Sequence, residues 1–107
     1  MKQLQNEFYG KGSVDGFMFK QIEKSECAYI YSVTTPYDTV HYEVFEHIET
    51  NGGDIVIGGK NVHYEAKVLY PKDNSFGITA YCTSTFPQAQ LRFNEINERV
   101  KNRKNNN

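Results

Sequence analysis

The residues best suited to chemistry are histidines that each precede a glutamate by two positions. The tetrapeptide Val-His-Tyr-Glu occurs twice, at residues 40–43 and 62–65. Two positions along a strand return to the same face of the sheet, so each His shares a face with its Glu. If the strands carrying His47 and His63 pair, these imidazoles with Glu65 or Glu49 form a candidate zinc site, because imidazole and carboxylate are ordinary zinc ligands.

The alternative for the same residues is a solvated sheet face. Cross-strand polar pairs contribute roughly 0.2–1 kcal/mol each, and any outward face collects them. No serine or cysteine lies in a nucleophile-elbow motif. Gly10-Lys11-Gly12-Ser13 is not followed by a predicted helix that would gather amides around a phosphate. The sequence therefore predicts no cofactor, and it favours a binding module over an enzyme.

Five strand-like segments must position these residues. Polar and apolar residues alternate most clearly in residues 40–48 and 62–70, which is typical of half-buried antiparallel strands. Polar turns or prolines separate the segments. The predicted strands are Val14–Ile22, Cys27–Thr34, Val40–Ile48, Val62–Tyr70 and Phe76–Cys82.

The period then changes to that of a helix. Thr85, Pro87 and Gln88 suit an N-cap, a first turn and a capping box. One apolar stripe follows, made of Ala89, Phe93, Ile96 and Val100. The predicted fold is α+β, a β-β-β-β-β-α chain whose antiparallel sheet of about five strands packs on one C-terminal helix. Residues 1–103 form the predicted domain, and residues 104–107 a disordered tail.

Residues 50–61 form the longest irregular segment, with a glycine pair at each end of Asp54-Ile55-Val56-Ile57. Glycine pairs permit positive φ angles, so the segment is either a protruding hairpin extension or a mobile loop. With one helix, we expect the second sheet face to stay open and to carry apolar side chains, which usually mark a contact. The predicted binding surface comprises Tyr29, Tyr31, Phe45, Leu69, Ile55 and Ile57.

Composition limits the classes of partner. The 107 residues carry 12 basic and 13 acidic side chains, a net charge of −1. Nucleic-acid binding is disfavoured, because neutralising phosphates requires a basic excess. No apolar run predicts a signal peptide or a membrane span, and two cysteines in separate strand-like segments indicate reduced, buried thiols. We expect a cytoplasmic protein that binds a protein partner or itself; a small-molecule ligand stays open.

Four segments together resemble small proteins encoded by phages and mobile elements of Bacteroidetes-like bacteria. They are Gly10–Phe17, His41–Glu46, Tyr70–Lys72 and Phe76–Ala80. The resemblance brings no assigned activity or site residues with it. It implies a phage accessory protein, and one such role is to inhibit or sequester a component of a host system. The alternative function is a small metal-dependent hydrolytic enzyme that uses the His/Glu cluster.

Overall fold

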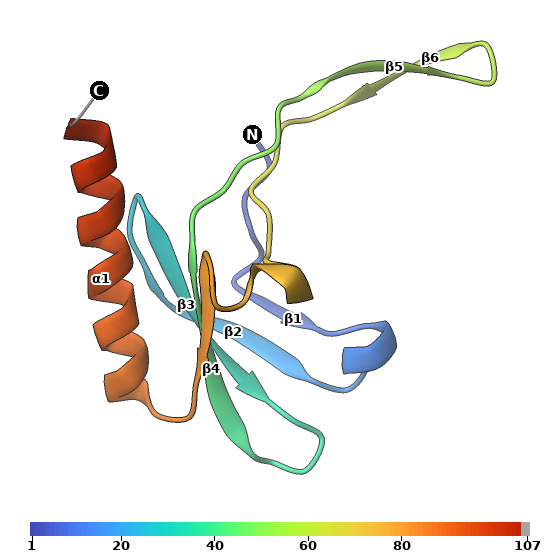
Figure 1. The fold of residues 1–107 in the computed structure, drawn as a ribbon. Helices are drawn as coiled ribbons and strands as arrows, with labels where there is room; N and C mark the ends of the chain where they lie inside the picture. The colour runs from blue at the N-terminus through green and yellow to red at the C-terminus, as the bar shows by residue number, and fades with distance from the viewer. Residues whose placement is uncertain (106–107) are drawn as a thin grey trace.

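The fold is an antiparallel sheet with a C-terminal helix on one face, as the sequence predicts (Figure 1). The computed structural model describes residues 1–105. The five-stranded sheet has the order β1-β2-β3-β4-β7, and β5 and β6 form a separate two-stranded sheet. The bounds are β1 Glu7–Tyr9, β2 Met18–Lys24, β3 Ala28–Thr34, β4 Val40–Glu46, β5 Gly53–Ile57, β6 Lys60–Tyr64, β7 Ala80–Thr83 and α1 Phe86–Asn105, with short 3-10 turns at Gly12–Val14 and Asp73–Ser75.

Helix α1 covers one face of the central strands. Its predicted apolar stripe is buried against Ala28 and Ile30 of β3 and Val44 of β4. Farther along the helix, Arg103 Nη1 donates to the buried carboxylate of Glu46 at 2.7 Å, and Arg99 Nη2 lies 3.6 Å from it. The cations matter because a buried carboxylate without a partner is strongly unfavourable. The helix is therefore held by apolar packing along its length and by charge near its C-terminus.

The opposite face of the sheet is closed, which corrects the expectation of an open surface. The side chains of Tyr29, Tyr31 and Phe45 point to this face and are buried. The N-terminal segment and the chain that follows the two-stranded sheet fold over them. From the covering segments, Leu4, Val68, Tyr70 and Phe76 pack on this face. Phe8 of β1 and Val14 and Phe17 of the connection to β2 complete the cluster.

The predicted strand Val62–Tyr70 is wrong as a member of the main sheet. Its first part is β6, which pairs with β5 outside that sheet, so Val62 and Tyr64 are exposed rather than inward. Its second part crosses the covered face, where Val68 is buried and makes one antiparallel bridge to Glu49. The fifth strand of the main sheet is instead β1, which pairs with β2.

The C-terminal helix continues beyond its predicted end. It runs through Asn105, two residues into the segment expected to be disordered, while residues 106–107 lie outside the described part. Over residues 1–105, no helix is both long enough and apolar enough to cross a membrane.

The two faces of α1 provide a stability test. Ile96 is 1% exposed in the core, so Ile96→Ala should lower the free energy of unfolding by about 2–5 kcal/mol, through lost burial and a residual cavity. Leu91→Ala, at a position 63% exposed on the same helix, should change it by less than about 0.5 kcal/mol. Urea unfolding measures both variants, and equal losses would contradict this packing of the helix.

Candidate functional site

The two strands outside the main sheet form an arm, defined here as residues 53–64, which projects away from the body (Figure 1). A stem of three chain segments holds its base. Thr50 N donates to Lys67 O at 2.8 Å and Leu69 N to Ile48 O at 2.9 Å. On the other side of the same segment, Lys2 N donates to Ala66 O and Lys2 O accepts from Val68 N, both at 2.9 Å. Backbone hydrogen bonds among these three segments therefore hold the base of the arm in place.

Glycines shape both ends of the arm. Gly58 and Gly59 form its tip with φ angles of 58° and 80°. Two consecutive positive φ angles are the geometry of a tight hairpin turn, and glycine adopts them without steric cost. At the base, a Cβ atom on Gly52 would lie 2.8 Å from the backbone nitrogen of Ala66. Of the two alternatives for residues 50–61, the structure shows the protruding hairpin.

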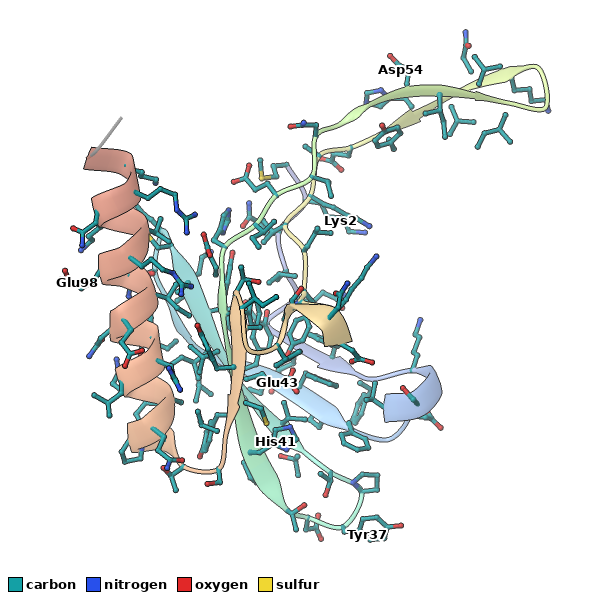
Figure 2. The ribbon with its side chains drawn as sticks, in the orientation of Figure 1. Lys2, Tyr37, His41, Glu43, Asp54 and Glu98 are labelled. Carbon is teal, nitrogen blue, oxygen red and sulfur yellow. The ribbon has the colours of Figure 1, made fainter. Side chains whose placement is uncertain are left out.

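The arm has one apolar face and one largely polar face. The register pairs Ile55 with Val62 and Ile57 with Lys60, so alternate residues share a side. The apolar face carries Ile55, Ile57, Val62 and Tyr64, which are 43%, 58%, 40% and 45% exposed. On the other face, His63 Nδ1 lies 2.9 Å from Asp54 Oδ1, and Asp54 is labelled in Figure 2.

The amphipathic pattern has a consequence for stability. A face with alternating apolar residues normally packs against a core, yet no apolar cluster of the described residues includes this one. Two-stranded ribbons are marginal in water unless a further layer covers them. A contiguous exposed apolar patch marks a contact with another molecule. The arm is therefore the candidate binding site.

The structure divides the predicted binding surface. Ile55 and Ile57 lie on the apolar face of the arm. Leu69 is partly buried at the stem. The three aromatic residues on β3 and β4 belong to the core, for the reason given above. Sequence reasoning missed Val62 and Tyr64, because a strand Val62–Tyr70 in the main sheet would turn both inward. The signal for a separate hairpin is the glycine pair at residues 58–59, which separates two short runs rich in β-branched and aromatic residues.

The predicted metal ligands lie apart, each with its own partners. Both ring nitrogens of His47 have hydrogen-bonding partners. Nδ1 lies 2.9 Å from Tyr29 Oη, and Nε2 lies 2.7 Å from Glu49 Oε2. His63 faces Asp54 on the arm, and Glu65 Oε1 lies 3.6 Å from the amino group of Met1. Within residues 1–105, no group of three His, Cys, Asp or Glu side chains could hold a metal ion. His47, His63 and Glu65 do not form the cluster that the sequence predicts.

A polar network on the sheet was not anticipated from the sequence. Tyr70 Oη donates to Glu43 Oε1 at 2.6 Å, and His41 Nε2 lies 3.4 Å from Glu43 Oε2; Figure 2 labels His41 and Glu43. Burial, and then the Glu43 carboxylate, raise the pKa of Tyr70 well above its ordinary value of about 10. The phenol therefore stays protonated and donates to a carboxylate that is mostly buried.

A cavity of about 880 Å³ is lined by residues of β7 and α1, and both His41 and Cys82 contribute to its lining. A catalytic cysteine needs a lowered pKa to supply its thiolate. Here partial burial, and then Glu43, raise the pKa of Cys82. The thiol is exposed, which corrects the sequence-based expectation that both cysteines are buried, but its surroundings do not activate it as a nucleophile.

No protein-family model, no curated protein and no solved structure matches the chain. The geometry of the molecule offers a partly buried polar network on the sheet and an exposed amphipathic arm that lacks a covering layer.

Replacing one phenol tests the polar network. Tyr70→Phe keeps the ring but leaves Glu43 Oε1 without its donor, so it should lower the free energy of unfolding at pH 7 by about 1–3 kcal/mol. In the wild type, the unfolded chain releases the Tyr70 proton before the native state does. The stabilising contribution is therefore complete below about pH 10 and is lost as the pH rises further.

The difference between wild type and variant should consequently narrow above pH 10. Urea unfolding at pH 7, 9 and 10.5 measures it. A difference that widens with pH would contradict this assignment of the phenol proton.

Proposed function

We propose that this protein is a non-enzymatic interaction module that binds a protein partner through the apolar face of its arm. The observation that carries the proposal is that Ile55, Ile57, Val62 and Tyr64 lie exposed on one side of a projecting ribbon. Burying these side chains against a partner removes apolar surface from water, which is the dominant favourable term in protein association.

The apolar surfaces of the main sheet are already covered by other parts of the chain, which leaves the arm as the better candidate for a contact. The helix-facing side of β3 and β4 is covered by α1, and the opposite side is covered by the N-terminal segment and residues 66–76. The arm differs because its apolar side meets no such cover. Its tyrosine also suits a contact, since aromatic residues are enriched at protein interfaces.

The setting of the proposal is a phage or mobile-element accessory protein in the cytoplasm, acting on a component of a host system. Two features support it. The four segments described in the sequence analysis resemble such proteins, and neither Cys27 nor Cys82 is paired in a disulfide, as is usual in a reducing compartment.

Neighbouring residues of β5 provide a matched test. Ile57 and Val56 are adjacent and exposed, at 58% and 69%, but point to opposite faces of the arm. Ile57→Asp places a charge on the proposed contact, whereas Val56→Asp places the same charge on the polar side. Tagged versions of both, made in the native host cell, are compared with wild type by quantitative affinity capture.

We expect Ile57→Asp to reduce the captured partner at least tenfold, because a desolvated carboxylate opposes the contact, and Val56→Asp to retain it. Both variants should keep the wild-type melting temperature of the body within a few degrees. Equal capture of the partner by the two variants would show that the apolar face of the arm does not bind it.

A further inference from the structure

We infer that the partner of the arm is a second copy of this chain, with the two arms packed face to face and antiparallel around a two-fold axis. This inference rests on the proposed function, since it concerns the same apolar face. It adds the identity of the partner, the direction of the arms and the residues that meet.

The apolar face is self-complementary about its centre. From base to tip it presents three rungs: Gly53 with Tyr64, Ile55 with Val62, and Ile57 with Lys60. A two-fold axis through the middle rung brings Ile55 onto Ile55 of the partner subunit and Val62 onto its counterpart. Two-fold interfaces use the same patch on both subunits, so a patch that matches its own reversed copy suits this symmetry.

The outer rungs match in size and charge when the arms run in opposite directions. The Tyr64 ring lies across Gly53, where a Cβ atom would come within 3.2 Å of the phenol oxygen, so the base is broad and aromatic. The opposite arm brings Ile57 and the ammonium group of Lys60 onto that base. An ammonium over an aromatic face is favourable, and parallel arms would forgo this contact.

Charge does not oppose the association. The arm carries one acidic residue, Asp54, one basic residue, Lys60, and His63, and the Asp54–His63 pair points away from the apolar face. The whole chain has a net charge of −1. Two copies therefore meet without the like-charge repulsion that disfavours self-association of strongly charged proteins.

The area sets the strength of the contact. Four partly exposed side chains form a patch on the order of 300–600 Å². A standard stable interface buries about 800 Å² per partner, so the arms alone fall at the weak end. We expect a dimer with a dissociation constant in the micromolar range, about −8 kcal/mol, in which each ribbon supplies the second layer that the other lacks.

Sedimentation equilibrium of the purified full chain, over protein concentrations from about 1 to 300 µM, tests the partner. Wild type should pass from monomer to dimer. Ile55→Asp, at the centre of the contact, should weaken dimerisation at least tenfold, while Val56→Asp on the opposite face should leave it unchanged. Circular dichroism of all three proteins controls for folding.

Cross-linking tests the direction of the arms. In a Cys82→Ser background, which removes the exposed native thiol, single cysteines are introduced by Ile55→Cys, Ile57→Cys or Val56→Cys and treated with a short bis-maleimide. In antiparallel arms the two copies of residue 55 meet, whereas those of residue 57 are displaced by four residues, about 14 Å along the ribbon. We expect a cross-linked dimer from Ile55→Cys alone.

Each of the other outcomes of these two experiments would contradict one part of the inference. Cross-linking through Ile57→Cys as well would contradict the antiparallel arrangement. A wild-type protein that stays monomeric at 300 µM would overturn the second copy as partner. That result leaves the capture comparison of Ile57→Asp with Val56→Asp unaffected, so failure of this inference and failure of the proposed function are distinguishable.

Discussion

The central constraint of this molecule is that one small sheet is buried on both faces by its own chain. Helix α1 covers one face, and the N-terminal segment with residues 66–76 covers the other. To reach that second face, the chain must return across the sheet after leaving β4. Residues 53–64 lie between this departure and return and pair with each other. Both faces of the sheet are already covered, so the arm has no open sheet face to pack on.

A polar contact with β4 holds each of the two covering layers in addition to apolar packing. Glu46, at the end of β4, accepts from Arg103 of the helix, and Glu43 on the other face accepts from Tyr70 of the returning chain. Neighbouring residues of one strand thus bind opposite layers, because side chains alternate between faces. These contacts give β4 its mixed sequence of glutamates and apolar residues. Through these contacts the two acidic residues of a central strand hold the covering layers to the sheet.

Much of the architecture could be predicted from the sequence, but its closure could not. The stripe from Ala89 to Val100 specifies the helix and its buried side, since a period of 3.6 has few alternatives. Alternation alone does not say which strand is the neighbour. Residues 62–70 alternate throughout, yet the first part pairs with β5 and the second crosses the sheet. The tyrosines of β3 looked like surface residues because their hydroxyl partners, such as Gln5 O for Tyr31, come from distant segments. The His/Glu prediction failed for the same reason, as it assumed a pairing of strands that the arm prevents.

The central claim is that the apolar face of the arm is covered when copies of the protein meet. Amide hydrogen exchange of residues 53–64, measured at 1 µM and at 300 µM, tests it most directly. A marginal ribbon opens readily on its own, and a second layer should suppress that opening. The account predicts that arm amides exchange several-fold more slowly at the higher concentration, while β3 amides exchange at the same rate in both samples. Arm amides that exchange equally fast at both concentrations would contradict it.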